Sequence, residues 1–266
     1  MTIFRRFLRD RRRSSLWWAL GFFSLVAFTV AFYPSIKGQQ NVDQVVKDLP
    51  PAVQAMFGLE SGVPISSAPG YLHARMFASL YPILLLVLAI GLGSAAIGGS
   101  EEDGVLELLL SNPISRRRVF AERFLAMAAL TFAQAAFFLA VLVPLAGLVG
   151  ALKGVSVSGL VVAGLGGAAL ALLHGSIAFS IGASTGRRGP AIGIASATAA
   201  AGYLAQGILV AADAPAVVLN LTPWHWFLKQ NLLVAGPNLA AWLPALGLSV
   251  AIAAASLPRF LSRDLR

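Results

Sequence analysis

The sequence predicts an all-α integral membrane protein with six transmembrane helices. Hydrophobic residues make up 58% of the 266 residues, charged residues make up 12%, and the mean hydropathy is +0.78. Soluble domains carry roughly 25% charged residues. A soluble protein with this sequence would need several core helices without a polar face, and almost nothing would remain to cover them. Composition therefore favours a membrane protein.

Six apolar runs set the expected positions of the membrane spans. A transmembrane helix needs about 20 apolar residues, with a range of about 17–25. The third run is slightly long and contains Pro144, and none of the six contains Asp, Glu, Lys or Arg. We treat residues 1–266 as a single transmembrane domain, with spans over about residues 16–33, 76–97, 124–149, 160–183, 191–212 and 239–257.

The positions of the 20 Lys and Arg residues predict the orientation of these spans. Most of them cluster in four segments that fall on the same side of the membrane: the amino terminus, the segment between spans two and three, the segment between spans four and five, and the carboxyl terminus. Cytoplasmic segments carry an excess of Lys and Arg. We therefore expect both termini in the cytoplasm, and on the outer side only Lys37, Lys47, Arg75, Lys153 and Lys229.

The same distribution explains the high isoelectric point of about 10.8. A basic protein can bind nucleic acid when its cations form one surface. Here the cations are divided among short segments in the way that membrane topology already requires. We therefore predict no nucleic-acid partner. The expected environment is the lipid bilayer of the cell membrane.

The amino terminus, about residues 2–13, predicts a short interfacial helix. Ile3 and Phe7 fall on one helical face, whereas Arg5 and Arg9 fall on the other. Such a helix can lie on an anionic leaflet. A disordered basic leader is the alternative. Trp17 then enters at the depth of the lipid headgroups, where aromatic residues are common.

Two outer segments carry sequence features beyond a simple connection. The loop over residues 34–75 is long for a connector and contains a possible helix within residues 42–58. It predicts either an outer cap or gate, or a loosely packed loop. Residues 213–238 are apolar but short, with Trp224, Trp226 and Phe227 among them. This segment is expected to lie along the outer membrane surface.

The sequence offers little for catalysis or metal binding. There is no cysteine, and His73, His174 and His225 are scattered without the spacing of a ligand set. We predict no metal site and no catalytic residue in this chain.

The few strongly polar residues within the spans are candidates for a substrate path, namely Gln134, His174 and Gln206. The alternative is that each makes a hydrogen bond between helices, worth about 1 kcal/mol or less. Ion-coupled transporters normally need carboxylates or unwound polar helices inside the membrane. Because the spans contain no charged residue, an ion-coupled mechanism is disfavoured.

Between spans two and three lies a charged segment that predicts a helix over about residues 100–111. Ser100 and Asp103 have the spacing of a capping box, and acidic residues favour the first turn of a helix. Leucines then supply an apolar face, and Asn112-Pro113 ends the helix. About three turns cannot cross a bilayer, so this helix is expected on the cytoplasmic surface.

The third span is expected to begin at Ser115, which can cap it. Arg116, Arg117 and Arg118 would then occupy the first turn, where cations oppose the helix dipole. Three explanations remain open for these arginines: membrane topology, a salt bridge from Arg118 to Glu122, and an acidic surface on a partner.

Residues 101–116 carry the pattern E-x-x-G-x-L-E-x-L-L-x-x-P-x-S-R. This pattern resembles the cytoplasmic segment between the second and third spans of ABC-2 type transporter permeases. The six-span layout, the basic amino-terminal helix and the apolar outer segment before span six are also similar. Shorter pieces resemble the subgroup that exports polyketide antibiotics and related drugs: Tyr33-Pro34, Leu49-Pro-Pro-Ala52, Met56-Phe-Gly58 and Gly70-Tyr-Leu72.

The resemblance implies that the helix over residues 100–111 is a coupling helix, which docks on a separate ABC ATP-binding subunit. The chain has no GxxxxGK[ST] phosphate-binding loop. ATP and Mg²⁺ are therefore expected on that partner, and no cofactor is expected on this chain. The residues that the resemblance assigns to coupling are Glu101, Glu102, Asp103, Gly104, Glu107, Leu108, Leu109, Leu110, Pro113, Ser115, Arg116, Arg117 and Arg118.

The resemblance further implies an exporter that works as a dimer with a second copy or a paralogue. An uncharged path suits hydrophobic or amphipathic cargo such as a drug, an antibiotic or a lipid, because a charge in the membrane centre costs at least about 2.5 kcal/mol. Two other classes stay open: a membrane scaffold or assembly protein without transport, and a membrane-embedded enzyme.

Overall fold

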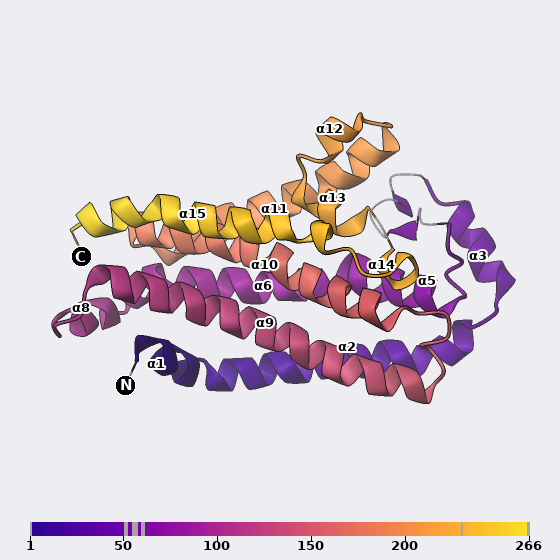
Figure 1. The fold of residues 1–266 in the computed structure, drawn as a ribbon, viewed down its shortest axis with the longest axis horizontal. Helices are drawn as coiled ribbons and strands as arrows, with labels where there is room; N and C mark the ends of the chain where they lie inside the picture. The colour runs from indigo at the N-terminus through magenta and orange to yellow at the C-terminus, as the bar shows by residue number, and fades with distance from the viewer. Residues whose placement is uncertain (1, 51–52, 55–57, 60–61, 230, 265–266) are drawn as a thin grey trace.

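The computed structural model describes residues 2–50, 53–54, 58–59, 62–229 and 231–264, and all regular structure within these ranges is helical. Six helices are long and apolar enough to cross a membrane, and Figure 1 shows them side by side as a bundle. The predicted all-α fold with six candidate spans is confirmed. The spans are α2 (Arg12–Ile36), a continuous helix over Ala68–Glu102, α9 (Arg116–Leu148), α10 (Val157–Thr185), α11 (Arg188–Ala211) and α15 (Leu243–Ser262).

The second spanning helix is longer than its apolar run, which starts at residue 76. It consists of α5 (Ala68–Leu72), the π-helical segment η2 (His73–Leu80), α6 (Tyr81–Ser94), the π-helical segment η3 (Ala95–Gly99) and α7 (Ser100–Glu102). Ser67 caps its first turn, since its Oγ accepts a hydrogen bond from the Gly70 amide over 3.3 Å. The start of this helix contains Pro69, Gly70, His73 and Arg75 but is largely buried in the fold, which is why hydropathy alone misses it.

The outer loop is correspondingly shorter than residues 34–75. It contains α3 (Gln40–Lys47), which covers the start of the helix predicted within residues 42–58. Residues 48–50 are not helical, and residues 51–52 and 55–57, which include parts of the 49–52 and 56–58 pieces, lie outside the described residues. The Asp43 carboxylate accepts hydrogen bonds from the Ser66 amide over 2.9 Å and from its hydroxyl over 2.6 Å. These bonds tie α3 to the segment that precedes α5.

The bundle is built around α10 and α6. In the most apolar stretch of each helix, 83% of the α10 residues and 72% of the residues of the Ala68–Glu102 helix are buried, whereas α2, α11 and α15 do not exceed 28%. These three peripheral helices therefore present much of their surface to lipid. The remaining span, α9, packs against α10, α6 and α2.

Glycines allow α6 and α10 to approach closely. A methyl group added to Gly93 would overlap the carbonyl oxygen of Gly175, and one added to Gly175 would lie 2.9 Å from the Ala89 oxygen. Small residues at helix contacts are typical of membrane proteins. By contrast, a methyl group on Gly91 would meet open space.

Aromatic side chains fill the junction of α2, α6 and α9. The rings of Tyr81 and Phe138 stack with centroids 4.0 Å apart, and Phe22 packs edge-on against both. The Tyr81 hydroxyl donates a hydrogen bond to the Gly164 oxygen of α10 over 2.6 Å. These contacts join α2, α6, α9 and α10 in one core.

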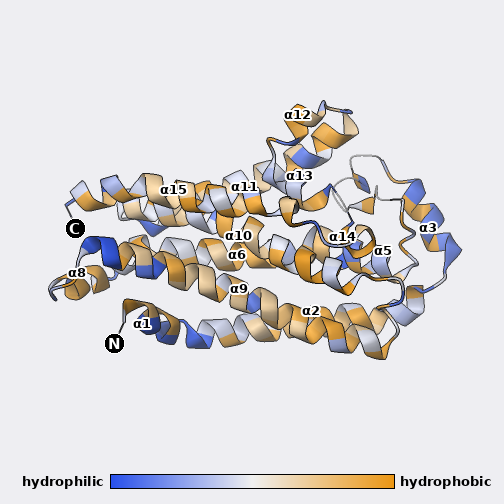
Figure 2. Ribbon diagram, viewed as in Figure 1, coloured by the Kyte–Doolittle hydropathy of each residue, from blue (hydrophilic) through white to orange (hydrophobic). Residues whose placement is uncertain are grey.

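The two ends of the bundle differ in composition. The amino terminus with α1 (Ile3–Asp10), α8 (Val105–Leu110), the α10–α11 turn and the carboxyl terminus lie at one end, which we call the basic end. The opposite end carries α3, with α14 (Leu232–Ala235) near it, and α12 (Ala216–Leu219) and α13 (Pro223–Leu228) project from the side of the bundle in the same half (Figure 1). Hydrophilic residues concentrate at the ends and apolar residues between them (Figure 2).

Candidate functional site

The helix α8 forms an exposed tip at the basic end. It begins after Gly104, whose φ of +69° lies in the left-handed region that favours glycine. Leu106 and Leu109 are buried against the bundle. On the other side of α8, Glu107 is exposed and the Leu108 side chain is 73% exposed. The exposed side of α8 thus carries a leucine beside a carboxylate.

The expected single helix over residues 100–111 is wrong. Residues 100–102 instead continue the second spanning helix, and Gly104 separates them from the six residues of α8. Ser100 does not cap a helix, because its hydroxyl donates a hydrogen bond to the Ala95 oxygen over 3.0 Å. Arg123 of α9 donates to the same hydroxyl. These buried contacts hold the end of the second span in helical form.

Two of the acidic residues assigned to coupling make contacts within the chain, although only Glu101 is buried. Glu101 is buried and forms a bidentate ion pair with Arg263, with Nη1 and Oε1 separated by 2.7 Å. Glu102 accepts a hydrogen bond from the Arg188 amide over 3.0 Å. The carboxylates therefore link the second span to α15 and to the start of α11. Asp103 is exposed.

Some of the basic residues after α8 also bond to other residues of the chain. Ser115 caps α9 as expected, since its Oγ accepts from the Arg118 amide over 3.3 Å. The expected Arg118–Glu122 salt bridge is present at 2.7 Å. Arg116 donates to the Arg263 carbonyl oxygen over 2.6 Å, whereas Arg117 is exposed.

The outward-facing residues of the assigned set form a smaller exposed surface. Gly104, Leu110 and Arg116 are half-buried, and Glu101 and Leu109 are buried. We use the name docking tip for the exposed members, which are Glu102, Asp103, Glu107, Leu108, Pro113, Ser115, Arg117 and Arg118.

The amino-terminal helix α1 packs against α9 at the same end. Its Ile3 and Phe7 side chains are buried, and the Phe4 amide donates a hydrogen bond to Glu122 over 2.8 Å. The Arg123 guanidinium lies over the Phe7 ring, 5.4 Å from its centroid. The predicted helix is therefore present, the alternative of a disordered leader is wrong, and the apolar face turns toward protein.

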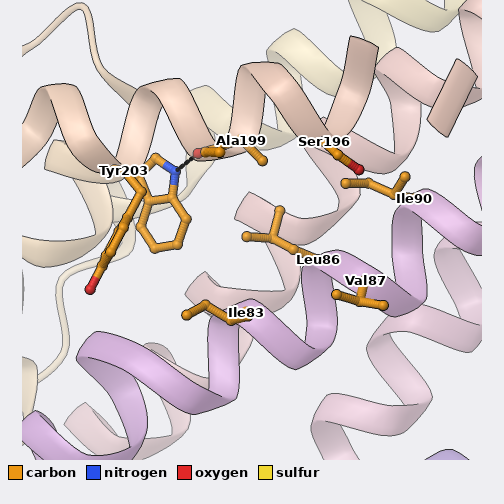
Figure 3. Close-up of a pocket in the computed structure, with 9 residues that line it drawn as sticks. Ile83, Leu86, Val87, Ile90, Ser196, Ala199 and Tyr203 are labelled. Carbon is orange, nitrogen blue, oxygen red and sulfur yellow. Dashed lines mark hydrogen bonds between the residues drawn. The ribbon is translucent and has the colours of Figure 1, made fainter. Parts of the chain in front are cut away.

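A second candidate site is an apolar groove between α6 and α11, shown in Figure 3. It has a volume of about 260 Å³. No charged side chain lines it among the described residues. Its lining consists of Ile83, Leu86, Val87, Ile90, Ser196, Ala199, Ala200, Tyr203 and Trp224.

The end of this groove away from the basic end is closed by α13. Trp224 is buried, and its indole N–H donates to the Ala199 oxygen over 3.1 Å (Figure 3). Gln206 of α11 binds Thr222 and the Nδ1 atom of His225, both over 3.2 Å. Burial and the nearby Lys229 lower the pKa of His225. Within the segment predicted to lie along the outer membrane surface, residues 213–238, these bonds hold α13 against α11, whereas α14 contacts α10.

The three polar residues considered for a substrate path lie on three different helices. Gln134 donates to the Ser15 oxygen of α2 over 2.9 Å, and its Oε1 has no hydrogen-bond partner among the described residues. The Nδ1 atom of His174 lies 3.0 Å from the Leu170 oxygen of its own helix. Neither they nor Gln206 line the groove. In the part of the chain that the structure describes, no three His, Cys, Asp or Glu residues gather as metal ligands.

Sequence reasoning missed Arg263 and the groove. Arg263 is one of several arginines near the carboxyl terminus, and nothing in its spacing points to Glu101. The groove arises from two helices that are distant in sequence, so no local pattern marks it.

The geometry agrees with comparisons against known proteins. Residues 1–265 match the family model described as "ABC-2 family transporter protein". No curated protein matches the chain. A match over essentially the whole chain, together with six apolar spans, shows that the chain belongs to the ABC-2 family of membrane transporter proteins.

Proposed function

We propose that this chain is the permease subunit of an ATP-driven exporter, energised by a separate ATP-binding subunit. The observation that carries the proposal is the docking tip, which leaves an exposed leucine on a short helix between two spans. Family membership supports a transport role, and the absence of a phosphate-binding loop in the sequence assigns ATP hydrolysis to another polypeptide. A second permease copy or a paralogue would complete the assembly.

The proposed orientation of the protein in the membrane follows from the positions of its basic residues. The clusters predicted as cytoplasmic fall in α1, in the segment after α8, in the α10–α11 turn and near the carboxyl terminus, all at the basic end. By the positive-inside rule this end faces the cytoplasm. The docking tip then meets a cytoplasmic ATPase, while α13 lies at the outer surface of the cell membrane.

The proposed cargo is a hydrophobic or amphipathic compound such as a drug, an antibiotic or a lipid. The groove between α6 and α11 offers aliphatic side chains, with Ser196 and Tyr203 as its few polar groups. Apolar cargo is recognised by such a lining without leaving a stranded charge in the bilayer. Its outer end is closed by Trp224, so release to the outside would require displacement of α13.

The contacts at the basic end indicate how movement of α8 would reach the groove. Gly104 joins α8 directly to the helix that contains α6, and α6 forms one wall of the groove. On the other side, Ser115 joins the tip to α9. A push on the docking tip would therefore act on two spans at once.

The test is a mild-detergent pull-down of the tagged full chain from its native membrane, followed by mass spectrometry and an ATPase assay. We expect a stoichiometric ATP-binding partner whose turnover rises with lipophilic compounds. A partner without stimulation would favour the scaffold alternative, and no nucleotide-binding partner would return the chain to the scaffold or enzyme classes.

Variants of the docking tip sharpen this test. Glu107→Arg reverses an exposed charge, and Gly104→Pro cannot adopt the left-handed backbone of that position. Both should abolish stimulated ATP hydrolysis while the protein still inserts into the membrane. Lys153→Glu, an exposed charge reversal at the opposite end, is the matched control. Normal stimulation in both tip variants would overturn the coupling assignment.

A further inference from the structure

We propose that the start of α2 is a binding site for one anionic phospholipid. The site is a surface groove of about 320 Å³ lined by Arg13, Leu16, Trp17 and Leu20. Its position at the basic end places it at the headgroup level of one leaflet. The proposal does not rest on export, because it concerns only how the permease sits in its membrane.

The spacing of these residues fits a lipid standing beside the helix. Positions 13, 16, 17 and 20 follow one face of an α-helix, and seven residues rise about 10 Å. Arg13 is exposed near the start of α2, and the residues that follow on this face are exposed by 61% at Leu16, 73% at Trp17 and 51% at Leu20. A lipid whose phosphate binds Arg13 would thus place its acyl chain along Leu16, Trp17 and Leu20.

The cations at this point have no ion-pair partner among the residues that the structure describes. Arg12 and Arg13 occupy the first turn of α2, where cations oppose the helix dipole, and no side chain caps that turn. Arg118 also lies in the first turn of its helix, α9, but is paired with Glu122. Within the described ranges, neither Arg12 nor Arg13 forms an ion pair. An anion from outside the chain would therefore meet cations that no carboxylate of the described residues already pairs.

A lipid fits better than a soluble anion or an acidic protein. Arg13 is followed on the same helical face by apolar residues that include Trp17. A cation next to an apolar face with a tryptophan is typical of the membrane interface. Exposed Arg5 and Arg9 on α1 add further positive charge nearby. A lipid with net negative charge is favoured over a zwitterionic one, since each basic side chain near the surface contributes attraction to anionic lipid.

Quenching of Trp17 fluorescence tests this directly. The full chain is reconstituted into phosphatidylcholine vesicles in which either phosphatidylglycerol or part of the phosphatidylcholine carries brominated acyl chains. Subtracting the signal of Trp17→Phe isolates the contribution of Trp17 from the other tryptophans. We expect brominated phosphatidylglycerol to quench Trp17 at a lower mole fraction than brominated phosphatidylcholine. Equal quenching by the two lipids would overturn the proposal.

Substitution of the cation provides the second arm. Arg13→Gln should reduce the preference for phosphatidylglycerol about fivefold, which corresponds to about 1 kcal/mol for one basic side chain. Arg13→Lys should retain most of it, and Lys37→Gln, an exposed cation at the other end of α2, should change nothing. An unchanged preference in Arg13→Gln would refute the assignment of the site. The assay needs neither ATPase nor cargo, so its failure leaves the proposed export untouched.

Discussion

Removing one partner of the ion pair between Glu101 and Arg263 should destabilise the basic end. The side chains are 3% and 16% exposed, and the contact is bidentate. Removing one partner of a buried pair costs about 3–5 kcal/mol, mostly because the other charge is left unpaired. Since Arg263 is partly exposed and can regain water, we expect the lower limit, about 3 kcal/mol, for Glu101→Ala.

A double-mutant cycle separates the pair from its surroundings. The free energy of unfolding is measured for the wild type, Glu101→Ala, Arg263→Ala and the double variant, by titration with denaturing detergent in mixed micelles. We expect a coupling energy of about 2 kcal/mol, because the double variant buries no lone charge. Arg118→Ala, which breaks a pair whose arginine is 59% exposed, should cost less than about 1 kcal/mol. Additive single effects would refute this reasoning.

Three further predictions concern glycines and one histidine. Gly93→Ala should destabilise the bundle by about 1–3 kcal/mol by overpacking against α10, whereas Gly91→Ala, which meets open space, should be nearly neutral in the same titration. Gly186→Ala places a methyl group against the Glu101–Arg263 pair at a φ of +70°, so it should cost at least about 1–2 kcal/mol, while Gly189→Ala in open space should not destabilise. The pKa of His225 is lowered from 6.5 in the folded chain. The unfolded chain therefore binds its proton more readily, and stability should fall as pH drops below 6.5 toward the folded pKa. Thermal unfolding followed from pH 7.5 to pH 5 should show this slope, and His225→Gln should reduce it.

The sequence predicts the spans well because lipid imposes a strict requirement on each one. Every backbone polar group in the bilayer needs an internal partner, so an uncharged run of sufficient length has to be helical. Contacts between residues three or four positions apart in a helix also depend only on the nearby sequence. The Ser115 cap and the Arg118–Glu122 salt bridge were predictable for that reason.

Features that depend on tertiary burial were not predictable. The second spanning helix begins at Ala68, and its His73 is buried although the surrounding sequence reads as a loop. The capping-box pattern at Ser100 suggested a helix start. In the fold, however, Arg123 of α9 contacts that hydroxyl, and the preceding helix continues to Glu102. A local signal was overridden by a partner more than 20 residues away.

The assignment of Glu101 illustrates the same limit and changes the interpretation of the docking tip. Its position in a family-like pattern suggested contact with a partner, yet it binds Arg263 at the end of α15. Glu102 likewise accepts from the amide that starts α11, and Arg116 binds the carbonyl of Arg263. The ends of four spans are thus fastened to one another immediately behind α8. If an ATPase pushes on Leu108, the displacement is transmitted to four helix ends that are bonded to one another, rather than absorbed by a flexible loop. Coupling should therefore be lost when these internal bonds are broken, even though the residues that form them do not all face the partner.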